Sequence, residues 1–323
     1  MLAVFKSKIV IKTFHLLFSF LIINCTKSSK ELKNTNEPYI IVLGITQDGG
    51  YPQAGTKKSE AWNDLSKRRH VSCLAIVDPE TSQRWMIDAT PDFREQLHFL
   101  DNIAPVPETP GLAGIFLTHA HIGHYTGLMH LGREAIGAKN VPVHVMPKMN
   151  DFLSNNGPWD LLVRLKNIEL RPLSEQIPIK LHDKISITPL LVPHRAEYTE
   201  TVGFRIDGSN KSVLFIPDID KWEELDQWGI RIEDWIREVD FAYLDGTFYA
   251  DGEIPGRSMY DIPHPFIEES LERFKTLPLD ERNKIRFIHL NRTNPALLDG
   301  SDAQKAIDQA GFQVAKELEI VVL

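Results

Sequence analysis

The stretch "IFLTHAHIGHYTGL" at residues 115–128 contains His119, His121 and His124, three of the twelve histidines in the chain. Residues 114–118 are predicted to form a buried strand that delivers "HAH" at its end. Because residues two apart in an extended segment point to the same side, His119 and His121 can face one metal ion. His124 begins a helix predicted over residues 123–137 and is expected to serve a second ion. Imidazole at this density suits zinc, with iron or manganese as alternatives.

Length and composition indicate an ordinary globular chain. It has 323 residues, of which 42% are hydrophobic and 25% charged, and this argues against disorder. The formal net charge of −8 gives no support to a nucleic-acid partner. We therefore expect a small-molecule substrate.

The first 38 residues are not expected to belong to the fold. Lys6, Lys8 and Lys12 precede the short apolar run "HLLFSFLII", which ends near Cys25. This pattern is typical of a secretory signal and too short for a stable membrane span. We expect a lipoprotein-type signal peptide over residues 1–24, a lipid anchor on Cys25 and a polar tether over residues 25–38, with simple cleavage or a retained anchor as alternatives. The expected location is the cell envelope, exported and membrane-tethered, and Cys73 is expected to be a buried free thiol.

From residue 39 to residue 323, short apolar strands alternate with amphipathic helices in a single predicted domain. Strands follow one another first, helices then intervene, and this pattern occurs twice, which indicates a layered α/β sandwich with mixed sheets. Several acids and histidines stand where predicted strands end, the edge at which α/β folds commonly build their sites. They are Asp88, His194, Asp218, Asp245 and His289.

With these residues in place, the chain resembles the metallo-β-lactamase fold superfamily. The signature of that superfamily is HxHxDH, then a single His, an Asp and a His, each after a strand. The resemblance covers nearly all of residues 39–323 and implies a four-layer αβ/βα sandwich. Within the superfamily, the stretches "GGYPQ", "DATPDFREQL", "YLDGTFY" and "IHLNRTNP" are similar to the coenzyme PQQ synthesis protein B group.

The resemblance also implies roles for particular residues. The first metal ion would be held by three histidines and the second by two, with one aspartate bridging both ions; these are His119, His121 and His194, then His124 and His289, and the bridging Asp218. Asp88 would orient a ligand histidine from behind, and Asp245 would lie beside the metals or only cap its strand. His264 would contact the substrate, with an ordinary surface histidine as the alternative.

Gly123 departs from the superfamily pattern, because it stands where the aspartate of the second metal ion should be. The first site keeps three histidines and the bridging carboxylate. The second site loses a hard oxygen ligand and a negative charge. We therefore expect one tightly bound zinc ion and a second, weaker one, unless Asp245 or Asp220 compensates.

The leading functional hypothesis is a metal-dependent hydrolase. A metal ion lowers the pKa of bound water towards about 7, so hydroxide can attack an ester at neutral pH. The resemblance of His264 to a histidine of phosphodiesterase-like members favours a phosphodiester, with Asp218 orienting the nucleophile and His264 assisting the leaving group. The alternatives are a role like that of the PQQ synthesis group, such as iron-dependent oxidation or handling of a cofactor precursor, and a non-catalytic binding protein on the same fold.

Overall fold

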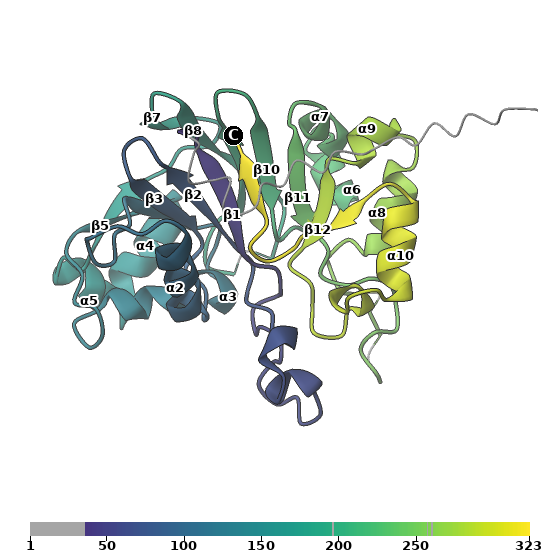
Figure 1. The fold of residues 1–323 in the computed structure, drawn as a ribbon, viewed down its shortest axis with the longest axis horizontal. Helices are drawn as coiled ribbons and strands as arrows, with labels where there is room; N and C mark the ends of the chain where they lie inside the picture. Colours follow the sequence, from purple (N-terminus) through teal and green to yellow (C-terminus); the bar gives the residue numbers. More distant parts are fainter. Residues whose placement is uncertain (1–35, 196, 257, 260) are drawn as a thin grey trace, which may run out of the picture.

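The computed structural model describes residues 36–323 except 196, 257 and 260. The predicted signal peptide, Cys25 and most of the predicted tether lie outside the described residues. Within the described part, the chain forms two seven-stranded mixed sheets with helices on their outer faces (Figure 1). Cys73 is a free, fully buried thiol, as expected. No helix among the described residues is long and apolar enough to cross a membrane.

The first sheet has the strand order β14-β1-β2-β3-β4-β5-β6. Its strands are β1 (Tyr39–Gly44), β2 (Cys73–Asp78), β3 (Gln83–Ile87), β4 (Gly114–Phe116), β5 (Val141–Val145), β6 (Ile168–Pro172) and β14 (Ile320–Val322). The first three strands and β14 pair antiparallel, and β3 to β6 pair parallel.

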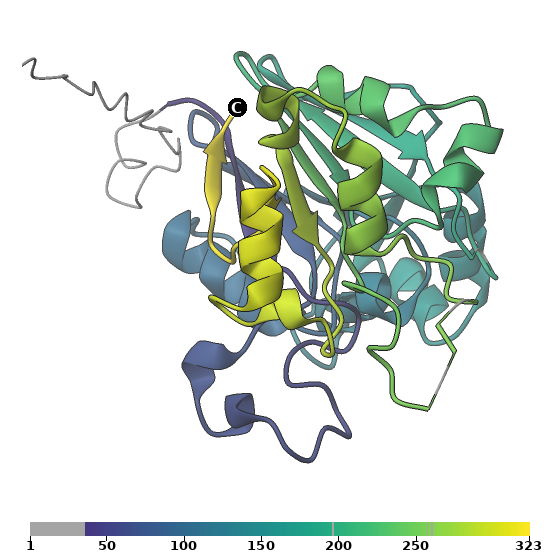
Figure 2. The same ribbon diagram turned by 90° about the vertical axis from the view of Figure 1, so that its right-hand side faces the viewer.

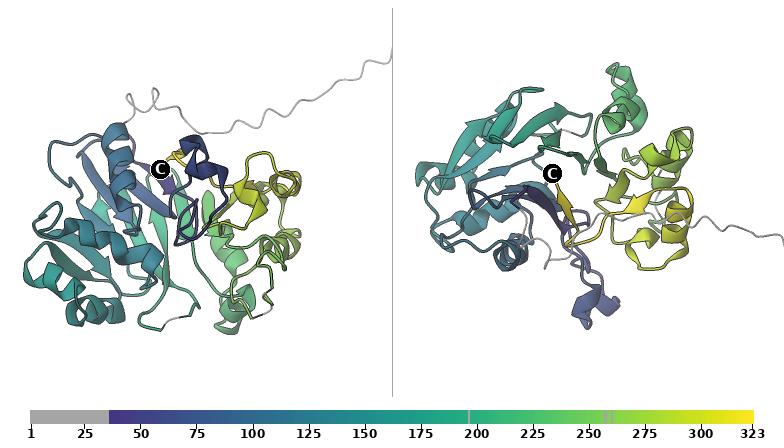
Figure 3. Two further views of the ribbon diagram at one scale, coloured as in Figure 1. Left: turned by 90° about the horizontal axis from the view of Figure 1, so that it is seen from below. Right: turned by 45° about the horizontal axis from the view of Figure 1, so that its top comes forward.

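The second sheet has the order β13-β12-β11-β10-β9-β8-β7. Its strands are β7 (Ile179–His182), β8 (Ile185–Leu191), β9 (Val202–Asp207), β10 (Ser212–Ile216), β11 (Phe241–Asp245), β12 (Ile285–Ile288) and β13 (Gln313–Val314). The strands β7 to β10 pair antiparallel and β10 to β13 pair parallel. Seen from below and from a tilted view, the two sheets face each other (Figure 3).

Helices cover the outer faces of the sheets. They are α2 (Phe93–Ile103), α3 (Ile122–Tyr125), α4 (Pro147–Asn155), α5 (Trp159–Arg164), α6 (Trp222–Gln227), α7 (Ile232–Arg237), α8 (Ile267–Phe274), α9 (Leu279–Arg282) and α10 (Asp302–Gln309). The described residues also form short 3-10 helices: η1 (Glu60–Trp62), η2 (Leu65–Lys67), η3 (Thr126–Leu131) and η4 (Pro295–Leu297). The sandwich expected from the sequence is confirmed.

The helix predicted over residues 123–137 is wrong in its length. The structure has the one-turn helix α3, then the 3-10 turn η3, and then turns. The cause lies at Gly127, where the chain passes close to the segment after β3. The Gly127 amide donates to the Ala89 carbonyl at 2.8 Å, so it is not used in a continuing helix. This contact holds the segment that carries His124 against the end of β3.

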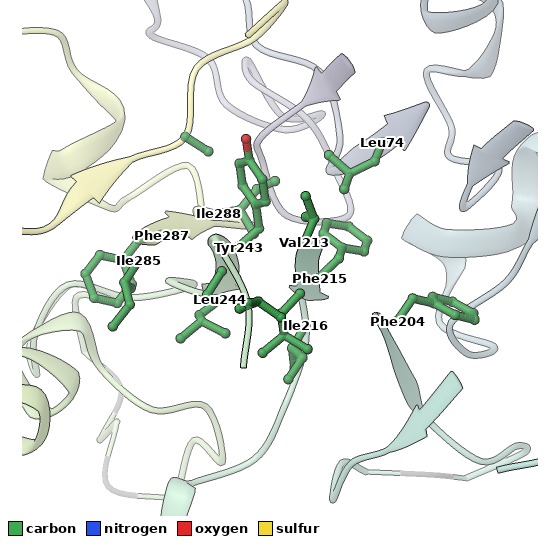
Figure 4. Close-up of a cluster of buried hydrophobic side chains, with 14 of the residues drawn as sticks. Leu74, Phe204, Val213, Phe215, Ile216, Tyr243, Leu244, Ile285, Phe287 and Ile288 are labelled. Carbon is green, nitrogen blue, oxygen red and sulfur yellow. The ribbon is translucent and has the colours of Figure 1, made fainter. Parts of the chain in front are cut away.

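The alternation of side chains along β1 shows how the core is built. Ile40 and Val42 belong to the core cluster that includes the second sheet, whereas Ile41 and Leu43 pack with the helices behind the first sheet. Successive side chains of a strand point to opposite faces, so a strand covered on both sides is apolar throughout. Figure 4 shows part of the core, in which Leu74 from the first sheet belongs to the same cluster as Phe215 and Tyr243 from the second.

Both sheets deliver strand ends to one common edge. The pairing directions make β1, β3 and β4 of the first sheet run the same way. In the second sheet β8, β10, β11 and β12 likewise run together. Their carboxyl ends lie along the lower edge in Figure 1, where α3 is labelled, and the segment with η1 and η2 projects beyond this edge (Figures 1 and 2). Residues that follow these strands therefore come together in space.

Candidate metal centre

Four of the expected ligands meet at this edge. His119 and His121 follow β4, His194 follows β8 and Asp218 follows β10. One ligand atom from each residue lies within 4.8 Å of one atom from every other. The sequence placed these residues far apart along the chain, and the two sheets bring them into one cluster, called the first cluster below.

The distances within the first cluster fit a tetrahedral ion. Asp218 Oδ2 lies 3.3 Å from His119 Nε2, 3.3 Å from His194 Nε2 and 4.0 Å from His121 Nδ1. His121 Nδ1 lies 2.9 Å from His119 Nε2 and 3.2 Å from His194 Nε2. Zinc bonds of 2.0–2.1 Å in a tetrahedron place ligand atoms about 3.3 Å apart. The donor atoms are therefore spaced as zinc would require.

Two carboxylates fix which ring nitrogen faces the first cluster. His194 Nδ1 donates to Asp220 Oδ1 at 2.9 Å, which leaves Nε2 turned inward. His121 Nε2 donates to Glu197 Oε2 at 3.0 Å, which leaves Nδ1 turned inward. A ligating histidine commonly donates its other ring N–H to such a partner, which sets its tautomer. Glu197 was not predicted from the sequence, and Asp220 was predicted only as a stand-in ligand.

Asp88 lies behind the histidines, as the resemblance implied. It is fully buried at the end of β3, with a φ of 70°. Its Oδ1 accepts the Thr118 amide at 2.8 Å, and its Oδ2 accepts His124 Nδ1 at 2.7 Å. The Thr118 hydroxyl donates to Asp88 and accepts from His119 Nδ1 at 3.0 Å. One carboxylate thereby directs Nε2 of both His119 and His124 into the site.

A second cluster lies beside the first and shares Asp218. His124 Nε2 lies 3.8 Å and His289 Nε2 4.0 Å from Asp218 Oδ2. Asp48 Oδ1 lies 3.5 Å from His124 Nε2, and the three side chains of Asp48, His124 and His289 form a group with metal-ligand spacing. Both Nε2 atoms, Asp48 Oδ1 and Asp218 Oδ1 are buried without a hydrogen-bond partner among the described residues. Buried polar atoms are rarely left unpaired, so this convergence fits a cation.

His289 is positioned by a relay that matches the one behind His119. Its backbone has a φ of 65°, and its Nδ1 donates to the Thr247 hydroxyl at 2.9 Å. That hydroxyl in turn donates to Asp245 Oδ1 at 2.7 Å. Each sheet thus supplies a buried Asp and a Thr at its edge, and each pair aims a histidine Nε2 at the site.

Asp245 and Asp220, which the sequence offers as stand-ins for the missing aspartate, are both hydrogen-bonded to other groups of the chain. Asp245 is close enough to Asp218 and His289 to be grouped with them. Its oxygens, however, already accept from the Ile219 amide, from the amide and hydroxyl of Thr247, and from His264 Nδ1. The carboxylate of Asp220 is engaged by His194. The sequence left open whether either residue compensates for Gly123, and in the structure both carboxylates already bind other groups of the chain.

His264 lies inside the site and not on the surface. It is 2% exposed, and its Nδ1 lies 2.8 Å from Asp245 Oδ2 and 3.2 Å from Asp218 Oδ1. Burial alone would lower its pKa, but Asp245 and Asp218 raise it above the ordinary value. The alternative of an ordinary surface histidine is wrong, because the ring is buried beside the carboxylates of Asp245 and Asp218.

The pKa values of the first cluster are shifted by burial and by the close contacts between its carboxylates and imidazoles. Despite burial, which would raise it, the pKa of Asp218 is held well below its usual range by His194 and His264. Burial lowers the pKa of His194, but Asp218 and Asp220 raise it to about 10. The pKa of His119 is lowered, chiefly by burial. Metal binding must therefore displace protons from this cluster, and metal affinity should rise with pH.

Comparison with known proteins agrees with this geometry. A family model described as the beta-lactamase superfamily domain matches residues 83–289. The chain belongs to the metallo-β-lactamase superfamily. It is 27% identical over 322 residues to the coenzyme PQQ synthesis protein B of Bradyrhizobium diazoefficiens. This alignment covers 88% of the present chain and 99% of the relative.

Two solved structures share the fold. The zinc-bound PqqB of Methylobacterium extorquens superposes with a TM-score of 0.72 at 22% identity, covering 88% of this chain and 100% of the other. A diphosphatase of the PhnP family superposes with a TM-score of 0.61 at 19% identity, covering 89% and 97%. The predicted superfamily and the similarity to the PQQ synthesis protein B group are confirmed, and metal binding is supported by the donor cluster.

Proposed function

We propose that this chain is a metal-dependent hydrolase that cleaves a phosphodiester. The observation that carries the proposal is the pair of adjacent donor clusters sharing Asp218. Two ions about 3.5–4 Å apart are the arrangement that phosphatases and nucleases use to clamp the attacking and leaving oxygens of an in-line displacement. Membership of a hydrolase superfamily and the shared fold of a PhnP-family diphosphatase support this reading.

For the ion of the first cluster we propose zinc. Three imidazoles and one carboxylate at tetrahedral spacing suit zinc better than a hard, oxygen-seeking ion such as magnesium. Bound there, the ion would lower the pKa of a coordinated water towards about 7 and polarise the oxygen under attack. The second cluster, with a larger share of oxygen donors, suits zinc, manganese or iron.

The residues of the chain supply the remaining parts of the chemistry. Asp218 faces both clusters, so it can orient the attacking water by accepting a hydrogen bond. His264 Nδ1 lies 2.8 Å from Asp245 Oδ2 and 3.2 Å from Asp218 Oδ1, so its ring can bring a proton to the site. There it can stabilise the anionic charge that develops on the phosphoryl oxygens or protonate the leaving oxygen. Glu197 and Asp220 keep His121 and His194 in the tautomers that ligation needs.

The test is hydrolysis of bis(p-nitrophenyl) phosphate by protein loaded with zinc or manganese. We expect turnover in the wild type, its loss in His119→Ala, and its retention in Asp299→Ala, a control on an exposed carboxylate. His264→Gln is expected to lower kcat while metal content stays unchanged. Metal content of protein purified without added metal identifies the ion. No turnover of any phosphodiester by the fully loaded wild type would refute the proposal and favour a binding protein.

A second candidate is a role in coenzyme PQQ synthesis. The observation that favours it is the similarity to curated relatives of that name, which extends over 88% of the chain. We expect such a role to appear as bound iron with oxygen consumption in the presence of a peptide-derived precursor. Zinc content together with phosphodiester turnover, and no oxygen consumption, would exclude it.

A further inference from the structure

We propose that Asp48, from the loop after β1, supplies the carboxylate of the second metal site, in the place that position 123 leaves open. The second ion would then be held by Asp48, His124, His289 and the shared Asp218. This inference rests on the proposed two-metal function, and it gives that function a complete second site. It also replaces the expectation, drawn from Gly123, that the second ion is short of a ligand.

The space beside Gly123 is filled by Asp48. A Cβ added at position 123 would lie 2.6 Å from Asp48 Cα and closer still to Asp48 Oδ1. Real Cβ atoms do not come this near to a backbone atom, so no residue larger than glycine fits at position 123 while Asp48 is in place. Glycine at position 123 is therefore the sequence feature that admits a carboxylate from another loop.

Asp48 is held in register with His289 by main-chain contacts between the two sheets. The amide of Gln47 donates to the Leu290 carbonyl at 2.9 Å, and Thr46 forms a parallel bridge with Leu290. A turn closed by the Gly50 amide on the Gln47 carbonyl, at 2.9 Å, brings Asp48 over the site. The residues next to Asp48 and next to His289 are thus bonded to each other, which fixes the spacing of the two ligands.

The chemistry of the group fits a divalent ion. Asp48 Oδ1, His124 Nε2 and His289 Nε2 are buried, face one another and have no hydrogen-bond partner among the described residues. Asp48 Oδ1 lies 3.5 Å from His124 Nε2, so the two atoms are close enough to bind one ion. With Asp48 and Asp218, two negative charges face the two clusters. The hard oxygen and the charge that Gly123 removes are thereby restored.

The test measures metal stoichiometry, not activity. Apo protein is titrated with zinc or manganese by calorimetry, and bound metal is counted by mass spectrometry after gel filtration. We expect two ions per chain in the wild type and one in Asp48→Ala, with affinity for the second ion weakened by roughly a hundredfold or more. Loss of an outer-shell partner alone costs about 10–100-fold, so loss of a ligand should reach at least that range. Asp299→Ala, the exposed control, should keep both ions.

An isosteric substitution separates this role from simple structural damage. Asp48→Asn keeps the size of the side chain and should leave the melting temperature of the apo protein near that of the wild type, but it removes the negative charge and should weaken the second ion. Gly123→Ala should lower the melting temperature, because its Cβ would lie 2.6 Å from the backbone Cα of Asp48. Retention of two tightly bound ions by Asp48→Ala or by Asp48→Asn would overturn the inference. A wild type that binds one ion only would overturn it as well.

These outcomes are distinct from failure of the proposed function. If the second ion depends on Asp48 but no phosphodiester is hydrolysed, this inference stands and the proposed activity falls. If phosphodiester hydrolysis proceeds with one ion per chain, the activity stands and the role of Asp48 falls.

Discussion

Replacement of Asp88 by Asn should weaken one metal site selectively. The substitution keeps the size of the side chain and keeps an oxygen that can accept from the Thr118 amide, which lies 2.8 Å from Oδ1. It places an NH₂ group where Oδ2 now accepts from His124 Nδ1 at 2.7 Å. Two donors would then face each other. His124 can avoid this only by moving its proton to Nε2, the atom that faces the second cluster.

The magnitude follows from the role of the contact. Loss of a partner that orients a ligating histidine typically costs about 10–100-fold in metal affinity. At about 1.4 kcal/mol for each factor of ten, this corresponds to roughly 1.4–2.8 kcal/mol. His119 reaches Asp88 only through the Thr118 hydroxyl, at 3.0 Å, and it shares its ion with His121 and His194. The first ion should therefore lose less affinity than the second.

The assay is competition with a chromophoric chelator, which resolves the two binding steps of the wild type and of Asp88→Asn. Far-ultraviolet circular dichroism controls for folding, since Asp88 is fully buried. The reasoning is refuted if Asp88→Asn binds both ions with wild-type affinity. It is equally refuted if the first step weakens as much as the second while the fold is intact.

Three further results are expected. Removal of metal by a chelator should lower the melting temperature by roughly 5–8 °C, because ligands come from both sheets and saturation at a hundred times Kd contributes about 2.7 kcal/mol; an unchanged melting curve would contradict this. His144→Phe should reduce the pH dependence of the free energy of unfolding. Burial, and secondarily Arg171, lower the pKa of His144 to about 4, so the unfolded chain binds a proton first and the wild type loses stability as pH falls from about 6.5 to about 4. Denaturant unfolding at several pH values would show this difference between the wild type and the variant. Glu197→Ala should weaken the first ion by less than tenfold in the same chelator assay, because the Glu197 side chain is 55% exposed and its contact with His121 is screened by water.

The sequence predicted those parts of the site that follow strands in a recognisable order. His119, His121, His194, Asp218 and His289 could be placed because each follows an apolar strand, and strand ends gather at one edge of an α/β fold. Asp88 could be placed for the same reason. The structure brings these side chains together with the spacing that a metal requires.

Asp48 could not be placed in this way, although it follows β1 at the same edge. The loop "QDGGYPQAG" has no metal-ligand spacing, and its acid becomes meaningful only once the contact with Gly123 is known. That contact joins segments from distant parts of the chain, and no local pattern encodes it. Two sequence features together could have indicated this ligand. Asp48 follows a strand whose carboxyl end lies at the site, and Gly123 stands where the superfamily pattern has an aspartate.

The exclusion between Asp48 and a side chain at position 123 restricts how such a site can change by single substitutions. A chain with a carboxylate on both loops would force a Cβ to within 2.6 Å of a backbone carbon, so that form does not pack. Replacement of Asp48 does not by itself open this space, because the backbone Cα stays in place whatever side chain it carries. A carboxylate at position 123 would also require the backbone of the loop after β1 to move. A single substitution can therefore remove the carboxylate of Asp48 and leave the three histidines and Asp218 of the first cluster, but it cannot transfer that carboxylate to position 123.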